Sequence, residues 1–153
     1  MPIKVLFVCH GNICRSVSAE YIFKELLKRR NLESSFYVDS AATSREEIGN
    51  EIYPPMRRTL VSHEIPVLNH HARQVMKQEY DDFDYIIAMD EENMYNLKRL
   101  FNQDLKHKVH FLLEYTNSPM EEIEDPWYTR NFEKAYQDIL KGCLALLDNL
   151  VHE

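Results

Sequence analysis

The 153-residue sequence contains only three cysteines and three glycines, and it has no long run of apolar residues. Three cysteines do not make the disulfide framework of a small secreted scaffold, so we expect a reducing, cytoplasmic compartment. The longest apolar runs, at residues 5–8 and 85–89, are far too short to span a bilayer. The N-terminus also lacks the apolar stretch and cleavage site of a secretory signal. We therefore expect neither a disulfide scaffold nor insertion into a membrane.

Positive charge is scarce as well, because 18 lysines and arginines stand against 25 aspartates and glutamates. The formal net charge of −7 argues against general nucleic-acid binding, which needs a dense basic surface. It leaves room for a small anion site, which one arginine and one helix N-terminus can provide. The length and the balance of apolar and charged residues predict a single globular domain over residues 1–153.

Apolar, β-branched segments alternate along the chain with segments of helical periodicity. The predicted strands cover residues 3–9, 36–40, 84–89 and 109–113. Four helices are predicted. The first has its apolar face at residues 19–27, the next two cover residues 56–62 and 91–101, and the last is a long helix from about residue 131 onward. This alternation predicts an α/β fold, a parallel sheet with helices on both faces. Ligands bind such sheets at the carboxyl ends of the strands.

The segment between the first strand and the first helix has the residues of a phosphate-binding loop. Cys9 and Arg15 are separated by five residues, a length that can curl so that backbone N–H groups point inward. Gly11 and Asn12 tolerate the positive φ that a curled loop requires. The same donors stabilise a thiolate, Arg15 can clamp two phosphoryl oxygens, and the Ser16 hydroxyl can hydrogen-bond the sulfur.

Other interpretations of this loop exist. Cys9 can be a buried thiol at a strand end, with Arg15 a solvated helix residue. Cys9, His10 and Cys14 can also be taken as metal ligands, but no second ligand pair accompanies them. The loop lacks the Gly-x4-Gly-Lys-Ser/Thr pattern of a nucleotide-binding P-loop. The strand before it and the helix after it favour anion binding, and we expect no metal.

A thiolate that attacks phosphorus needs an acid for the departing oxygen, and Asp125 is the candidate. Pro126 follows it and favours an extended backbone, which suits a carboxylate aimed from a loop. Trp127 and Tyr128 can form an aromatic wall for a phenyl ring. The alternative is an ordinary turn before the last helix, with the aromatic residues packed on the core.

Taken in order, these motifs resemble the low-molecular-weight protein tyrosine phosphatase family over essentially the whole chain. The matching segments are residues 8–16, 18–20, 39–44, 70–74, 83–90 and 125–128. The resemblance implies a flavodoxin-like sheet of four parallel strands with a phosphate-binding loop after the first strand. It implies hydrolysis of phosphotyrosine in two steps, without metal or cofactor. Cys9 would take the phosphoryl group, Arg15 would bind it, and Asp125 would serve as general acid and then base.

The resemblance also implies roles for other residues. Asn12 would hold the loop in shape with Ser40, and His70 would support that network. Cys14 would form a reversible disulfide with Cys9 that protects the thiolate. Phosphotyrosine proteins would be the substrates, a cognate tyrosine kinase a candidate partner, and the chain a monomer or weakly self-associating. The expected substrate-binding residues are His10, Gly11, Asn12, Ile13, Cys14, Ser16, Glu46, Trp127 and Tyr128.

The sequence departs from the family pattern at two positions. Val17 stands where many members have proline, which removes some stiffness at the helix start. Glu46 stands where an aromatic residue often lines the crevice, so one wall can be charged. We therefore predict a preference for substrates with basic residues near the phosphotyrosine.

Two other functions compete with this one. An arsenate reductase resembles this fold and loop, but it needs additional cysteines, and the remaining Cys143 lies on an apolar helix face. A phosphate-binding module without catalysis would need neither a thiol nor an acid. The presence of Cys9, Arg15 and Asp125 together favours the phosphatase.

Overall fold

In the computed structural model, which describes residues 1–151, four strands form one parallel sheet in the order β2-β1-β3-β4. The strands are β1 (Ile3–Cys9), β2 (Phe36–Ala42), β3 (Tyr85–Ala88) and β4 (Val109–Phe111). The α/β fold and the four-stranded parallel sheet predicted from the sequence are confirmed. From β1 the chain adds β2 on one side and then β3 and β4 on the other, so the strand order reverses between β1 and β3. The carboxyl ends of these two strands are therefore the expected ligand site.

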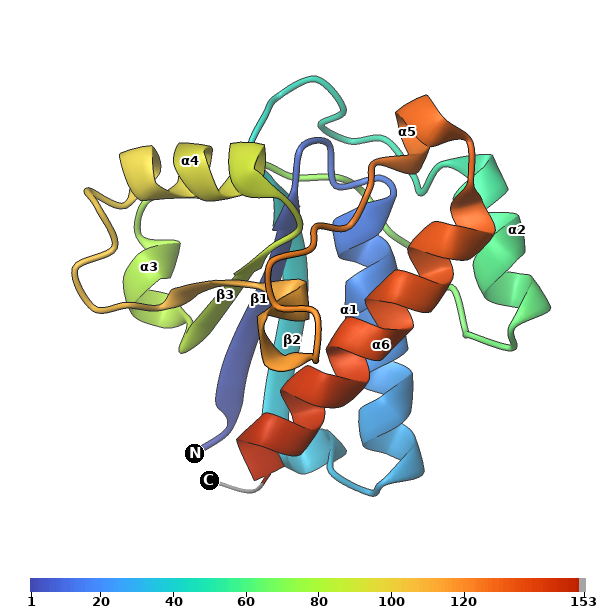
Figure 1. Cartoon of the computed structure of the whole chain (residues 1–153), viewed down its shortest axis with the longest axis horizontal. Coiled ribbons are helices and arrows are strands. Elements are labelled where there is room, and N and C mark those ends of the chain that lie inside the picture. The colour runs from blue at the N-terminus through green and yellow to red at the C-terminus, as the bar shows by residue number, and fades with distance from the viewer. Residues whose placement is uncertain (152–153) are drawn as a thin grey trace.

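Strand β1 lies at the centre of the sheet and is buried on both faces. Val5 and Phe7 pack into one hydrophobic cluster, while Leu6 and Val8 pack into a second cluster on the other face. This two-sided burial explains why the strand is a continuous apolar run with no polar alternation. Figure 1 shows α4 on one side of the strands and α1, α2 and α6 on the other. Helices therefore cover both faces, as predicted.

The helices carry the apolar faces that cover the sheet. The α-helices are α1 (Arg15–Arg29), α2 (Pro54–Ser62), α3 (Glu79–Asp82), α4 (Glu91–Leu100), α5 (Pro126–Thr129) and α6 (Phe132–Val151). Two 3₁₀ turns, η1 (Glu33–Ser35) and η2 (Leu112–Tyr115), complete the elements. Helix α6 buries Ile139, Leu146 and Leu147 on the predicted stripe, next to the buried face of α1.

Several boundaries differ from the sequence-based prediction. The predicted strand 109–113 ends at Phe111, because the chain then tightens into η2. The predicted strand 36–40 extends to Ala42, where it pairs with the last residue of β1, Cys9. Helices α3 and α5 were not predicted, because four residues are too few to show a helical period. The Asp125 carboxylate caps α5, so the expected acid loop is a helix start.

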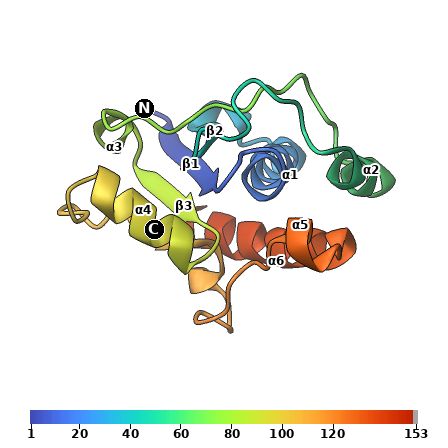
Figure 2. The ribbon, with the colours of Figure 1, turned by 90° about the horizontal axis from the view of Figure 1, so that it is seen from above.

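Two long connections run side by side across the carboxyl ends of the strands. The first joins β2 to α2 and the second joins α2 to α3, and Figure 2 shows them together above the sheet. Backbone hydrogen bonds join Gly49 to Ala72 and Ala72 to Asn50, and Ala42 bridges Gln74 in parallel. These connections place residues from both segments beside the end of β1.

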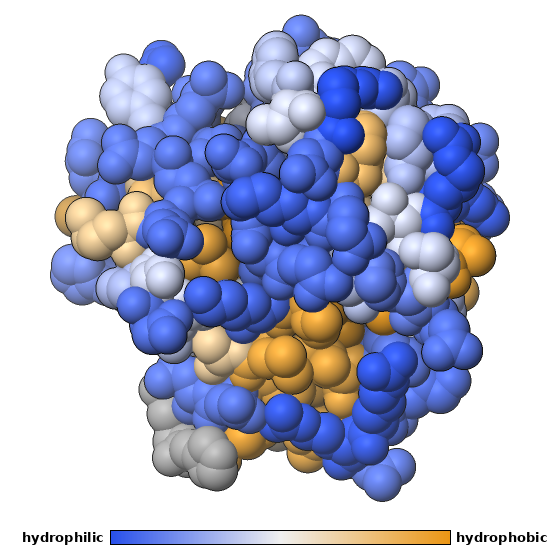
Figure 3. Space-filling view, turned by 45° about the vertical axis from the view of Figure 1, so that its right-hand side comes forward, coloured by the Kyte–Doolittle hydropathy of each residue, from blue (hydrophilic) through white to orange (hydrophobic). Residues whose placement is uncertain are grey.

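The surface is mainly polar. In Figure 3, hydrophilic side chains cover most of one face, and a hydrophobic area lies in the lower half of the view. Among residues 1–151, no helix is long and apolar enough to cross a membrane.

Candidate active site

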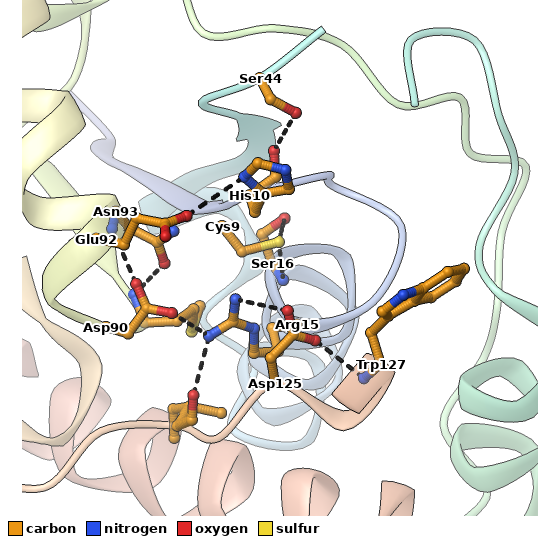
Figure 4. A network of polar contacts seen from close by, with 12 residues as sticks. Cys9, His10, Arg15, Ser16, Ser44, Asp90, Glu92, Asn93, Asp125 and Trp127 are labelled. Carbon is orange, nitrogen blue, oxygen red and sulfur yellow. Dashed lines mark hydrogen bonds and ion pairs between the residues drawn. The ribbon is translucent and has the colours of Figure 1, made fainter. Parts of the chain in front are cut away.

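The loop after β1 surrounds the thiol of Cys9 with hydrogen-bond donors. The backbone N–H groups of Asn12 and Ser16 each lie 3.4 Å from the sulfur. The Ser16 hydroxyl oxygen lies 3.1 Å from it, and Figure 4 shows this hydroxyl and the sulfur facing each other. Ser16 is the second residue of α1, so the sulfur lies at the N-terminus of this helix. This environment stabilises the thiolate form of a cysteine.

The loop turns at Asn12, which has a φ of 59° in the left-handed region. The expectation that Gly11 also has a positive φ is wrong, because Gly11 is absent from the positive-φ residues of the described chain. Close packing, and not backbone conformation, favours glycine at position 11. A Cβ there would lie 3.2 Å from the Cγ of Glu47, so the loop and the β2–α2 connection pack closely.

A buried polar network holds Asn12 in this conformation. Its Nδ2 donates to the hydroxyl oxygens of Ser16 and Ser40, at 2.8 and 3.0 Å. Its Oδ1 accepts from the backbone N–H of Arg73 at 3.2 Å, and its carbonyl oxygen lies 2.7 Å from the His70 ring. The structure thus brings Ser40 and His70 to Asn12, the contacts that the family resemblance implies. Such fully bonded networks keep a strained turn rigid.

Arg15 lies at the first position of α1 and is 3% exposed. One of its terminal nitrogens donates to Asp90 Oδ2 at 2.7 Å and to the carbonyl oxygen of Ile123 at 2.9 Å. The other lies 3.4 Å from Asp125 Oδ2. Burial disfavours the charged form, but Cys9, Asp125 and Asp90 outweigh it and raise the pKa of Arg15. The guanidinium is therefore anchored on one edge and faces the sulfur side of the site with the other (Figure 4).

Asp125 reaches the site from the N-cap of α5. Its Oδ1 accepts from the backbone N–H of Trp127 at 3.0 Å, while Oδ2 faces Arg15. The Trp127 ring packs on Tyr53, with ring centroids 4.9 Å apart, and it remains half exposed. Tyr128 is more exposed still. Figure 4 shows the Trp127 ring extending away from Asp125.

These side chains surround one pocket of about 160 Å³ at the carboxyl end of β1. It is lined by Cys9, His10, Gly11, Ile13, Cys14, Arg15, Glu46, Glu47, Asp125, Trp127 and Tyr128. The predicted site residues therefore converge, except that Asn12, Ser16, Ser40 and His70 do not line the pocket. At the rim, the His10 ring hydrogen-bonds Glu46, and its Nδ1 lies 3.5 Å from Glu92 Oε1.

The other two thiols differ from Cys9 in their surroundings. Burial, together with the charges of Cys9 and Asp125, raises the pKa of Cys14 far above the usual thiol range. Burial alone does the same for Cys143. All three cysteines are free thiols. Both additional thiols are therefore protonated at neutral pH, although Cys14 lines the same pocket as Cys9.

Sequence reasoning missed two residues that shape the site. Asp90 was not among the predicted site residues, yet it both caps α4 and anchors Arg15. Its position just after β3, the neighbour of β1, is a signal that could have identified it. Tyr53 was not considered, and nothing in the sequence signals that it meets Trp127. No cluster of metal-ligating side chains occurs within residues 1–151.

Comparison with known proteins places these observations in a family. The model of the family described as "Low molecular weight phosphotyrosine protein phosphatase" matches residues 4–153. The chain belongs to this family. A phosphatase of that description from Gallus gallus is 44% identical over 150 residues, covering 94% of this chain and 93% of the relative. The protein YfkJ of Bacillus subtilis is 41% identical over 152 residues, covering 99% and 97%.

Solved structures of the low molecular weight phosphatases share the fold closely. The crystal structure of YfkJ superposes with a TM-score of 0.96 at 40% identity, covering 99% of this chain and 96% of that one. A structure titled as a Drosophila arginine phosphatase has a TM-score of 0.88 at 36% identity, covering 97% and 98%. One of these similar structures is thus of a protein named for a substrate other than phosphotyrosine.

Proposed function

We propose that the chain hydrolyses phosphotyrosine in proteins through a cysteinyl-phosphate intermediate. One observation carries the proposal: the sulfur of Cys9, held by two backbone N–H groups and a hydroxyl, shares one pocket with Arg15 and Asp125. A nucleophile, an anion clamp and an acid are the three groups that this reaction needs. The names of the relatives support phosphotyrosine as the substrate.

In the first step the Cys9 thiolate attacks phosphorus, the S–P bond forms and the P–O bond to tyrosine breaks. The edge of Arg15 that faces Asp125 and the loop N–H groups bind the phosphoryl oxygens as charge develops on them. The carboxyl of Asp125 gives its proton to the departing phenoxide oxygen. Asp90 and the Ile123 carbonyl hold Arg15 in place throughout, because they bind the opposite edge.

In the second step water hydrolyses the cysteinyl phosphate. The Asp125 carboxylate takes a proton from water, the oxygen attacks phosphorus, and the S–P bond breaks to give inorganic phosphate. The Ser16 hydroxyl donates to the departing thiolate, since its oxygen already accepts from Asn12. Asp125 is then protonated again and ready for the next substrate.

The rim of the pocket suits an aromatic substrate with charged neighbours. Trp127 and Tyr128 offer exposed ring surface, and Ile13 offers an apolar side chain. Glu46 lies on the same rim, with two thirds of its side chain exposed. We therefore keep the prediction that basic residues near the phosphotyrosine favour hydrolysis. Equal rates for phosphopeptides with Lys or Glu at the flanking positions would contradict it.

The decisive experiment compares wild type, Cys9→Ser and Asp125→Ala in the presence of a chelator. The substrates are p-nitrophenyl phosphate, a phosphotyrosine peptide and the matched phosphoarginine peptide. We expect the wild type to hydrolyse the first two, Cys9→Ser to bind phosphate without turnover, and Asp125→Ala to lose about 10²- to 10⁴-fold in kcat. A freshly reduced wild type that binds phosphate without turnover would indicate a binding module. Faster hydrolysis of the phosphoarginine peptide would indicate that phosphoarginine, and not phosphotyrosine, is the substrate. Thiol oxidation that depends on arsenate would indicate an arsenate reductase.

Further proposals concern the cell. We place the chain in the cytoplasm, as a single phosphatase domain over residues 1–153. It acts on the products of a cognate tyrosine kinase, as a monomer or weakly associated chain.

Cys14 lines the pocket beside Cys9. A peroxide would oxidise Cys9 to a sulfenic acid, and the Cys14 thiol would then displace water to form a disulfide, reversible by a thiol reductant.

A further inference from the structure

A second, polar groove adjoins the active-site pocket on the far side of His10. It measures about 370 Å³ and lies between the segment that follows β2 and the helix α4. His10 lines both hollows, so they share one wall. The polar and charged residues that line the groove are Thr43, Ser44, Gln74, Asn96 and Arg99.

The unpaired charge at this groove is positive, although the chain as a whole is acidic. Arg99 stacks over the Tyr95 ring, 5.7 Å from its centroid, and has no carboxylate partner within residues 1–151. Arg45 donates to Gln74 Oε1 at 3.3 Å and likewise forms no ion pair in the described chain. Two acidic side chains, Glu46 and Glu92, face the His10 ring.

The polar groups of the groove are held in place by their own hydrogen bonds. Ser44 Oγ donates to the carbonyl oxygen of His10 at 2.9 Å, and Gln74 Nε2 donates to the carbonyl oxygen of Thr43 at 3.2 Å. The hydroxyl of Thr43 is buried and has no hydrogen-bond partner in the described part of the chain. A hollow with ordered polar walls and a guanidinium group that forms no ion pair in the described chain is suited to an anion.

We propose that this groove binds a carboxylate side chain that flanks the phosphotyrosine of the substrate, with Arg99 as the specificity-determining residue. The proposal rests on the phosphotyrosine phosphatase function. A peptide whose phosphotyrosine occupies the pocket passes over His10 to reach the groove, because His10 separates the two. Arg99 then pairs with the carboxylate. This preference is separate from the one assigned to Glu46, because it depends on Arg99.

The test uses matched phosphotyrosine peptides that carry Asp or Asn at one flanking position at a time. Values of kcat/KM are measured for wild type, Arg99→Gln and Arg58→Gln. Arg58 is an equally charged, exposed residue of α2, on the opposite side of the molecule from α4 (Figures 1 and 2). p-Nitrophenyl phosphate, which has no flanking residue, reports the chemistry alone.

We expect wild type and Arg58→Gln to prefer Asp over Asn about two- to fivefold at one or two positions. Arg99→Gln should lose that preference, and added salt should weaken it in the wild type, because the groove is open to solvent. All three proteins should hydrolyse p-nitrophenyl phosphate equally. The absence of any Asp preference, its survival in Arg99→Gln, or a loss of p-nitrophenyl phosphate turnover in Arg99→Gln would overturn the proposal. Failure of the wild type on p-nitrophenyl phosphate would instead overturn the phosphatase function itself.

Discussion

At the scale of single residues, the three cysteines show how local surroundings decide reactivity. The Cys9 sulfur meets two backbone N–H donors and the Ser16 hydroxyl at a helix N-terminus, whereas Cys143 is enclosed by apolar side chains. Cys14 lies on the pocket wall, but burial raises its pKa and the neighbouring Cys9 and Asp125 charges add to the effect. The thiolate is the reactive form, so geometry alone does not make Cys14 a nucleophile.

We therefore predict that iodoacetamide at neutral pH modifies Cys9 alone. Cys14 and Cys143 have raised pKa values and stay protonated until the pH is far above neutral. Intact-mass and peptide mass spectrometry should find one adduct on wild type and none on Cys9→Ser at the same exposure. Inorganic phosphate should slow the reaction, because it occupies the loop. Rapid modification of Cys14 in either protein would contradict this assignment.

A second residue-scale prediction concerns Asp90. Asp90→Asn keeps a hydrogen-bonding side chain at the N-cap of α4 but removes the charge that anchors Arg15. Hydrogen bonds to charged groups contribute about 1.5–3 kcal/mol, so we expect kcat/KM to fall at least tenfold. Inhibition by inorganic phosphate should weaken in parallel, which a change confined to helix stability would not produce. Glu91→Gln, one residue further along, is the control, and an equal effect there would contradict the role of Asp90.

At the scale of elements, Tyr53 connects three parts of the site. Its backbone N–H donates to the Ile13 carbonyl of the phosphate loop at 2.8 Å, and it is the N-cap of α2. Its ring meets Trp127 of α5, and its hydroxyl accepts from Arg130 at 3.0 Å. The Arg130 guanidinium lies over the Tyr53 and Phe132 rings, 5.5 and 5.2 Å from their centroids. The helix that carries the acid is thus tied to the loop that carries the nucleophile.

Removing the Arg130 contacts with Tyr53 should specifically impair proton donation by Asp125. We predict that Arg130→Ala lowers kcat about three- to tenfold for phenyl phosphate and less for p-nitrophenyl phosphate. The reason is that nitrophenoxide leaves without a proton more readily than phenoxide does. Tyr53→Phe keeps the ring contacts and should have a smaller effect. Equal losses on both substrates would show that Arg130 does not act through the position of Asp125.

The elements also show what the sequence can and cannot predict. Strand β1 and the loop after it were predictable, because two-sided burial requires an apolar run and an anion loop requires a particular set of residues. Helix α5 was not, since four residues carry no periodicity. The Arg15–Asp90 and Tyr53–Arg130 pairs are separated by 75 and 77 residues. Such contacts depend on how strands and helices pack, which no local pattern records.

At the scale of the whole molecule, α6 closes one face of the sheet by packing against α1 and η2. The close approach to η2 occurs at Gly142, a residue type that weakens a helix interior. A Cβ there would lie 2.5 Å from Leu112 Cγ and 3.1 Å from both of its methyl groups. Leu112 is 1% exposed, so it has little room to move away. Absence of a side chain thus allows the two elements to meet.

We accordingly predict that Gly142→Ala destabilises the protein, against the usual effect of alanine in a helix. Helix propensity alone would favour alanine by about 1 kcal/mol. Overpacking costs about 1–3 kcal/mol, and at this contact distance we expect it to dominate. Each kcal/mol lost should lower the Tm by about 2–4 °C in a chain of this size. Lys141→Ala, an exposed neighbour on the same helix, is the control for propensity. A Tm for Gly142→Ala at or above the wild-type value would mean that η2 yields, and that the packing of α6 does not depend on this glycine.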